Sequence, residues 1–261
     1  MKKRKNQALL SPASAFVLCL LFCAALPLPL SAAGIQGTDA SDSGRGSQPS
    51  GTSAAAIPQA DRVTYQEDFF YESLSEEIKA RITGISYGEG CIVPYEDLRY
   101  LHVLYIDFQG LPHAGEIICN KAIAQDLAEI FYELYLAEYP IERIRLIDEY
   151  DGDDTVSMED NNTSCFNYRV VDGTSSLSKH AYGMAIDINP LYNPYVTYPK
   201  GKRRVSPAAG AVYADRNKDF PYKIDKNDLC YQLFTEHGFT WGGSWKTMKD
   251  YQHFQKSLPE N

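Results

Sequence analysis

Positive charge is scarce in this sequence. Its 261 residues include 25 Lys and Arg against 34 Asp and Glu, a formal net charge of −9. If the first 33 residues are removed, four basic and no acidic residues go with them, and the balance becomes 21 − 34 = −13. A chain this acidic is a poor partner for nucleic acid, and charge alone would not hold it on an anionic polymer. The basic run KGKRR at residues 200–204 is the exception, and it predicts either a solvated loop or a contact with a substrate carboxylate.

A long hydrophobic run is also missing. The apolar stretch at residues 15–30 is broken by prolines, whereas a membrane-spanning helix needs about 20 apolar residues. The sequence KKRK precedes this stretch and SAA follows it, which is the pattern of a signal peptide with its cleavage site. We therefore expect a signal peptide over residues 1–33 and an exported protein, with an uncleaved N-terminal membrane anchor as the alternative.

Large apolar side chains are few in residues 34–64, where Gly, Ser, Ala, Asp, Gln and Pro dominate. Such a segment cannot bury enough surface to offset its conformational entropy, so we expect a flexible linker. No internal repeat is visible in the chain. Residues 65–261 are enough for one domain with its own core, and we expect this domain to act as a monomer.

Cysteine is sparse and irregularly spaced. Two cysteines lie in the predicted signal peptide, and four remain beyond it: Cys91, Cys119, Cys165 and Cys230. Their spacing is unlike that of a zinc ribbon. In an exported chain an even number of cysteines permits two disulfides, and buried free thiols are the alternative.

The remaining pattern predicts short strands and helices. Strands are expected at residues 101–108, near 116–119 and at 141–147, and helices at 76–83, 121–139 and around 228–236. The sequence SLSE, which begins at Ser73, fits a capping box for the first helix, and Gly84 would end that helix. An acidic loop is expected after residue 147. The pattern predicts an α+β domain with a small, mostly antiparallel sheet and helices packed on one side.

Histidine and aspartate are concentrated in two segments near the C-terminus. The first, SKHAYGMAID, contains His180 and Asp187, and the second, GFTWGGSWKTMKDYQH, ends with Asp250 and His253. Two imidazoles and one carboxylate are the ligands of a catalytic zinc ion, which keeps its fourth position for water. We expect His180, Asp187 and His253 to bind Zn²⁺, and Asp250 to accept the proton of the water. No metal role is expected for the other three histidines, His102, His113 and His237.

Local patterns indicate how these side chains could meet. Residues 184–189 alternate as a strand, with Asp187 on the face opposite the large apolar side chains. Gly183 fits a tight turn before this strand, where a positive φ favours glycine. Asp250 lies three residues before His253, so both can face one site only if the chain bends or a strand begins near Asp250.

These segments resemble the VanY-type zinc D-alanyl-D-alanine carboxypeptidases, part of a wider group of peptidoglycan metallopeptidases. The shared motifs are S-x-H-x-x-G-x-A-x-D and D/E-x-x-H, and the blocks NNTSCFNYR, DINPLYNPY and WGG are similar as well. The resemblance covers roughly residues 70–257. It implies a hedgehog/D-Ala-D-Ala-peptidase-like fold with the zinc site on the sheet, and peptidoglycan stem peptides as substrates.

The resemblance also implies further roles. Arg169 stands shortly before the S-x-H block, where the family has an arginine that binds the substrate carbonyl or the developing oxyanion; a salt bridge on the sheet is the structural alternative. Ser178 and Trp241 are expected to contact the substrate, with a turn cap and a core anchor as their alternatives. Many relatives carry Glu where this chain has Asp250, so the shorter Asp must approach the site from closer backbone.

Three functions fit this sequence. The first is a zinc D-alanyl-D-alanine carboxypeptidase that removes the terminal D-Ala of stem peptides, because the blocks outside the zinc motif are most similar to VanY-type enzymes. The second is an L-alanyl-D-glutamate or related stem-peptide endopeptidase, which would share every catalytic residue. The third is a non-catalytic, zinc-stabilised cell-wall-binding domain.

Overall fold

The computed structural model describes residues 61–171 and 173–257, all within the second of two units of the chain, Ala55–Asn261. The described residues have α+β structure with mostly antiparallel strand pairs, as the sequence predicts. The predicted signal peptide and most of the predicted linker lie outside them. The first strand begins at Val63, just before the expected domain start at residue 65. In the described part of the chain, no helix has the length and hydropathy needed to cross a membrane.

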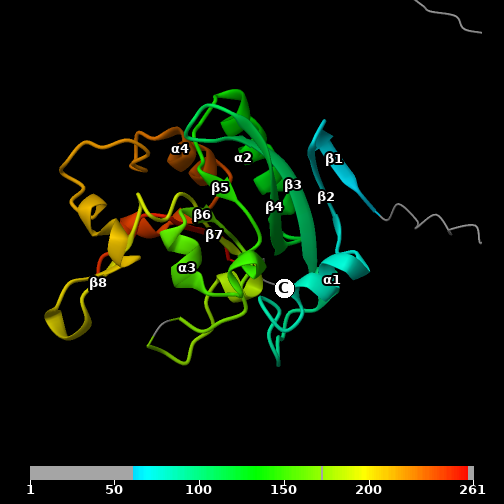
Figure 1. Ribbon diagram of the computed structural model, residues 1–261, viewed down its shortest axis with the longest axis horizontal. Helices are drawn as coiled ribbons and strands as arrows, with labels where there is room; N and C mark the ends of the chain where they lie inside the picture. Colours follow the sequence, from blue (N-terminus) through cyan, green and yellow to red (C-terminus); the bar gives the residue numbers. More distant parts are fainter. Residues whose placement is uncertain (1–60, 172, 258–261) are drawn as a thin grey trace, which may run out of the picture. The chain divides into compact units, whose positions relative to one another are not determined.

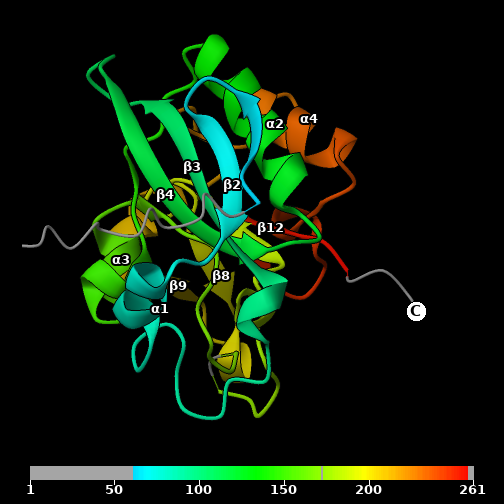
Figure 2. The same ribbon diagram turned by 90° about the vertical axis from the view of Figure 1, so that its right-hand side faces the viewer.

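A four-stranded antiparallel sheet forms the largest layer (Figure 2). Its strands are neighbours in chain order: β1 (Val63–Gln66), β2 (Phe69–Ser73), β3 (Leu98–Ile106) and β4 (Pro112–Asn120). The β3–β4 pair is continuous from Leu98 opposite Asn120 to Ile106 opposite Pro112. β4 is longer than the strand predicted near 116–119, whereas β3 begins three residues before and ends two residues before the predicted 101–108, since the turn begins at Asp107.

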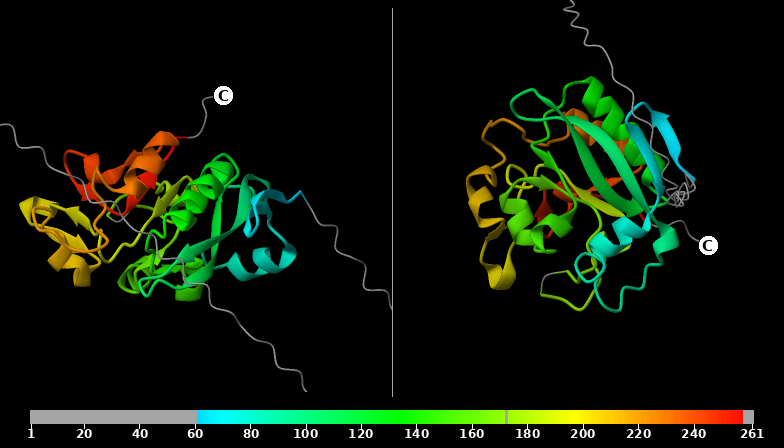
Figure 3. Two further views of the ribbon diagram at one scale, coloured as in Figure 1. Left: turned by 90° about the horizontal axis from the view of Figure 1, so that it is seen from above. Right: turned by 45° about the vertical axis from the view of Figure 1, so that its right-hand side comes forward.

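Alternation along β4 places hydrophobic side chains on both faces of this sheet. Ile117 and Cys119 join the main core, which includes α2 (Ala124–Leu136) and α4 (Leu229–Glu236). Ile118 joins a second cluster with Ile82 of α1 (Glu76–Ile82). Successive strand side chains point to opposite faces, so α1 and α2 cover opposite sides of β4. In Figure 3, left, α4 (orange) lies against the red C-terminal segment.

The helices predicted at 76–83, 121–139 and around 228–236 are α1, α2 and α4, and the predicted cap of α1 needs correction. The N-cap of α1 is Ser75, whose hydroxyl accepts a hydrogen bond from the Ile78 amide at 3.2 Å. The prediction of Ser73 as the cap was wrong, because Ser73 still belongs to β2 and pairs with Arg99. The predicted helix around residues 228–236 is α4, and the Asp228 carboxylate caps it.

The rest of the chain forms three smaller sheets (Figure 1). In the first, β5 (Arg143–Ile144) pairs with β6 (Asn162–Thr163). In the second, β8 (Tyr195–Thr197) lies between β9 (Arg204–Ser206) and β11 (Lys249–Asp250). In the third, β12 (His253–Gln255) lies between β10 (Thr240–Trp241) and β7 (Ala185–Asp187). Only the β5–β6 pair is parallel among these. The main core reaches into the last sheet, because Ile186 and Phe254 belong to it.

The segment after α2 departs most from the prediction. A strand was expected at residues 141–147, but β5 contains two residues, and a 3-10 turn follows at Ile147–Tyr150. The expected acidic loop contains a short helix, α3 (Asp154–Glu159), which Asp153 caps through the amides of Thr155 and Val156. The remaining 3-10 turns are Tyr95–Asp97, His180–Tyr182, Pro199–Gly201, Ala208–Tyr213 and Gly242–Ser244.

Candidate metal centre and active site

Three of the predicted site residues come together in one buried cluster. Asp187 of β7 and His253 of β12 are directly opposite each other in the antiparallel pair, and His180 reaches them from the turn before β7. The Asp187 Oδ1 atom lies 3.0 Å from His253 Nδ1 and 3.3 Å from His180 Nε2. The two imidazoles approach to 3.1 Å between His180 Nε2 and His253 Nδ1. One ligand atom of each residue lies within 4.8 Å of the others, so the group could hold a metal ion.

The turn between His180 and β7 depends on Gly183. Its φ is +64°, and a Cβ at this position would lie 2.6 Å from the amide nitrogen of Asn120. The glycine therefore allows both the left-handed backbone and the close contact with the end of β4. The Gly183 carbonyl oxygen also accepts a hydrogen bond from the Asn120 amide at 2.9 Å, which fixes the turn with His180 against the end of β4, while Met184 and Ile186 enter the core.

Each imidazole is oriented by a hydrogen bond from its outer nitrogen. His180 Nδ1 donates to the carbonyl oxygen of Cys165 at 2.6 Å, and His253 Nε2 lies 3.0 Å from Gln255 Oε1. In the neutral rings, these partners leave the lone pairs of His180 Nε2 and His253 Nδ1 available to a metal ion in the cluster. Metal-binding histidines commonly have such support from the far side of the ring. The arrangement fits a metal ion with two nitrogen ligands and one carboxylate ligand.

The cluster is strongly coupled electrostatically. Burial opposes the charging of His180, yet the Asp187 carboxylate raises the pKa of this imidazole above its ordinary value. Burial likewise opposes ionisation of Asp187, but His180 and His253 hold its pKa well below the usual range. Asp187 is therefore ionised over the physiological pH range, as a metal ligand must be.

Asp250 lies beside this cluster, and the change of strand that was predicted between Asp250 and His253 is present. Asp250 pairs with Tyr195 in β11, the strand then ends, and the chain enters the other sheet at His253. The Asp250 side chain is buried, and its Oδ1 atom has no hydrogen-bond partner among the described residues. Burial raises the pKa of Asp250 to about 8, with a further contribution from the Asp187 charge.

Gly242 packs directly against both Asp250 and His253. A Cβ at Gly242 would lie 2.7 Å from the Asp250 Cβ and 3.3 Å from the His253 Cβ. The 3-10 turn at Gly242–Ser244 can therefore pack on both residues only because position 242 has no side chain. The sequence alone does not show this role, because Asp250 and Gly242 are brought together only by the fold.

Arg169 is held by a carboxylate next to the site. Its Nη2 atom donates to Asp154 Oδ2 at 2.7 Å, while its buried Nε has no partner among the described residues. The positive charge of Arg169 partly opposes the rise in the pKa of both His180 and Asp250. The salt bridge of the structural alternative is therefore present, and the contact with the substrate stays a prediction.

Ser178 and Trp241 have structural contacts of their own. The Ser178 hydroxyl accepts a hydrogen bond from the His180 amide at 3.2 Å, so it caps the turn that carries the ligand. The Trp241 indole donates to the carbonyl oxygen of Tyr251 at 2.9 Å, and its ring packs on Gly243. Trp245, half-buried, lies closer to the cluster, with its ring centroid 5.4 Å from that of His253. Trp241 and Trp245 both line a hollow of about 440 Å³.

The other three histidines contact residues outside the cluster, and the cysteines form no disulfide. His102 contacts the Asp68 carbonyl, and His113 and His237 pair with Asp107 and Asp126. The four cysteines beyond residue 60 are free thiols, so neither of the two possible disulfides forms. Within residues 61–171 and 173–257, His180, Asp187 and His253 form the one group of this kind that could hold a metal.

A comparison with protein families finds a match over the part of the chain that contains this cluster. Residues 172–256 match the peptidase M15 family model described as D-alanyl-D-alanine carboxypeptidase. The match includes all three candidate ligands and Asp250, whereas Arg169 and Asp154 precede it. No curated protein and no solved structure matches the chain. The similarity to the D-alanyl-D-alanine carboxypeptidase family that the sequence motifs indicate is therefore found again over residues 172–256.

Proposed function

We propose that this chain is a zinc-dependent peptidoglycan peptidase that removes the terminal D-alanine of stem peptides. The observation that carries the proposal is the buried group of His180, Asp187 and His253 with Asp250 beside it. The family match over residues 172–256 supports the choice of a D-alanyl-D-alanine bond. The cluster alone supports only a metal site.

Zinc is the ion that the ligand set fits best. Two imidazole nitrogens with one carboxylate make a three-ligand site that leaves a fourth position for water or substrate. Magnesium and calcium prefer oxygen ligands, and only Asp187 supplies one here. Zinc bound to these residues would lower the pKa of a water molecule to about 7 and polarise the scissile carbonyl.

The roles of the protein side chains follow from their positions. Asp187 and the two imidazoles would hold the ion, and the contacts with Cys165 and Gln255 fix the ring orientations. Asp250 accepts the proton of the attacking water and then donates it to the leaving amine. Arg169 donates hydrogen bonds to the oxygen of the scissile carbonyl as negative charge develops on it. Ser178 supports His180 from the backbone side, and Trp241 supports the turn that presses on Asp250.

Mass spectrometry of muropeptides digested with the zinc-loaded chain tests the proposal. Loss of one D-Ala from pentapeptide stems is the expected result. Scission between L-Ala and D-Glu would instead identify the endopeptidase alternative, and unchanged muropeptides would favour a non-catalytic cell-wall-binding domain. Asp250→Asn in the same experiment separates hydrolysis at this site from a contaminating peptidase.

Export belongs to the same proposal. Peptidoglycan stem peptides lie outside the bacterial cytoplasm, and the basic, apolar and small-residue pattern of residues 1–33 provides a signal peptide. Residues 34–64 then act as a linker, and residues 65–261 as a monomeric peptidase domain without a nucleic acid partner; an uncleaved N-terminal membrane anchor is the alternative to the signal peptide. N-terminal sequencing of the secreted protein tests the cleavage site, and a mature chain that begins at Gly34 is the expected result.

A further inference from the structure

Arg169 is attached to its surroundings at two points. Its backbone carbonyl accepts a hydrogen bond from the Ser178 amide at 3.0 Å, which ties it to the segment that carries His180. Its guanidinium binds Asp154 through Nη2 at 2.7 Å, and both side chains are 28% exposed. A charge-assisted bond of this length restricts a side chain that otherwise has many rotamers.

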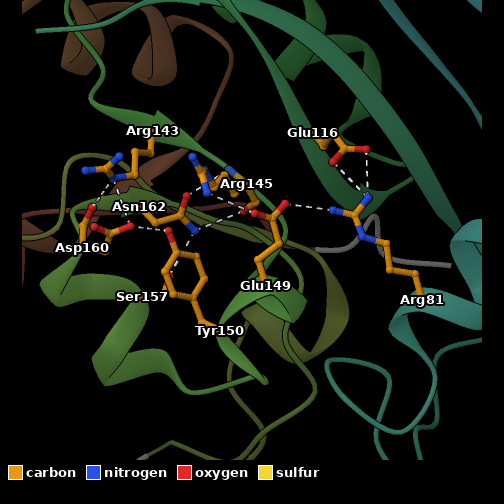
Figure 4. Close-up of polar contacts among 9 residues, drawn as sticks. All are labelled: Arg81, Glu116, Arg143, Arg145, Glu149, Tyr150, Ser157, Asp160 and Asn162. Atoms are coloured by element: carbon orange, nitrogen blue, oxygen red, sulfur yellow. Dashed lines mark hydrogen bonds and ion pairs between the residues drawn. The ribbon is translucent and has the colours of Figure 1, made fainter.

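The helix that carries Asp154 is itself firmly held, as Figure 4 shows for its later residues. The Ser157 hydroxyl accepts a hydrogen bond from Asn162 Nδ2 at 3.1 Å. At the end of α3, the Asp160 carboxylate accepts from the Tyr150 hydroxyl at 2.7 Å and pairs with Arg143 Nε at 3.0 Å. These contacts join α3 to β5, β6 and the preceding turn, so the backbone that carries Asp154 is fixed in place.

The same segment is tied to the site a second time. Asn167, two residues before Arg169, donates from Nδ2 to the carbonyl oxygen of Gly152 at 3.2 Å, and its amide donates to the carbonyl oxygen of His180 at 3.2 Å. The segment 165–169 therefore lies between Gly152, just before α3, and the turn that carries His180. The backbone of Arg169 is thus fixed next to the turn that carries the ligand His180, and the Asp154 contact restricts where its guanidinium lies.

We propose that Asp154 is a positioning residue, which holds the Arg169 guanidinium beside the metal cluster and leaves its other N–H groups for the substrate carbonyl. The inference rests on the proposed function and deepens it. One Nη2 bond occupies one of five N–H donors, and the Arg169 Nε has no protein partner in the described part of the chain. Asp154 acts on the reaction through Arg169 and does not touch the substrate.

Kinetics on a pentapeptide ending in D-Ala-D-Ala test this role with the full chain. Removing an oxyanion donor, as in Arg169→Ala, is expected to lower kcat about 10²- to 10³-fold. Asp154→Asn keeps the side-chain shape and should lower kcat about 10-fold with little change in KM, because the affected contact strengthens in the transition state. Asp154→Glu restores the charge and should recover part of the loss. Asp154→Asn should have no further effect in an Arg169→Ala background.

Glu159→Gln is the matched control, because it removes one negative charge from the exposed end of the same helix. Zinc content should be the same in every variant, since the three ligands are intact. Unchanged kcat in Asp154→Asn, or an equal loss in the Arg169→Ala background, would overturn the proposal.

A second readout does not depend on the proposed function. In ¹⁵N NMR spectra, the Arg169 Nε–H signal, assigned by its loss in Arg169→Lys, should shift and broaden in Asp154→Asn and remain unchanged in Glu159→Gln. If the wild-type chain hydrolyses no stem peptide, the proposed function fails while this spectrum still decides the orientation of Arg169. A signal that is identical in wild type and Asp154→Asn would overturn the positioning role.

Discussion

His253 and Asp187 face each other across the β7–β12 pair, with His253 Nδ1 3.0 Å from Asp187 Oδ1. Two of the three candidate ligands are therefore fixed by strand register, and only His180 depends on a turn. A shift of one residue in this register would move each side chain to the other face of the sheet. The core positions of Ile186 and Phe254 oppose such a shift, because both side chains are fully buried beside the ligands.

Gln255 should control metal affinity, because it contacts the outer nitrogen of His253 at 3.0 Å. Gln255→Leu removes the acceptor that keeps His253 Nδ1 directed at the metal, and the zinc dissociation constant should rise about 10- to 100-fold. Gln255→Glu keeps an acceptor and should bind zinc far better than the Leu variant. Competition with a chromogenic chelator measures both constants, and equal affinities for wild type and Gln255→Leu would refute the role.

Gly242→Ala should damage the site although position 242 binds nothing itself. The added Cβ would stand 2.7 Å from the Asp250 Cβ, so either this turn or Asp250 must move. We expect activity to fall by at least tenfold and the free energy of unfolding by about 1–3 kcal/mol. Gly88→Ala is the control, because the nearest atom to its Cβ would be 3.9 Å away. Comparable activity in the two variants would contradict the packing argument.

Zinc binding should release protons near neutral pH. In the metal-free protein, burial raises the pKa of Asp250 to about 8, so its carboxyl is mostly protonated at pH 7. A bound cation favours the ionised form, so binding expels this proton, and zinc affinity should fall as the pH is lowered from 8. Titration calorimetry in two buffers of different ionisation enthalpy counts the protons. Asp250→Asn should release about one fewer, and an equal number would show that Asp250 does not titrate with the metal.

Asp250→Asn also separates catalysis from metal binding. The three ligands remain, so zinc should stay bound, while kcat should fall by at least ~10²-fold because the amide cannot accept the water proton. Asp250→Glu restores the side chain that is commoner among relatives and tests whether a longer reach is tolerated. Metal analysis beside kinetics distinguishes the outcomes: loss of zinc in the Asn variant would make Asp250 a ligand or a structural support.

The sequence predicted the elements whose signals are local. The apolar spacing of α2 and the glycine after His180 are visible within a few residues, and the ligand segments occupy short motifs. The predicted change of direction between Asp250 and His253 is present, because β11 and β12 belong to different sheets. The capping residue of α1 was misplaced by two positions, since Ser73 and Ser75 look equivalent until β2 is known to include Ser73.

Residues that act through long-range contacts were missed. Asp154 is one of several acidic residues in its stretch, and only the fold shows that it binds Arg169, fifteen positions later. Gln255 could have been found, because it lies two residues after His253 on one strand and so shares its face. The Cys165 carbonyl that orients His180 carries no side-chain signal at all.

The most direct test of the account is the zinc content of the purified chain, measured together with D-Ala release from a D-Ala-D-Ala pentapeptide. We predict one zinc per chain and hydrolysis in the wild type. In His180→Ala both should be lost, whereas His113→Ala, which removes an imidazole paired with Asp107 on the surface, should retain both. Full zinc occupancy with normal hydrolysis in His180→Ala would contradict the assignment of this site.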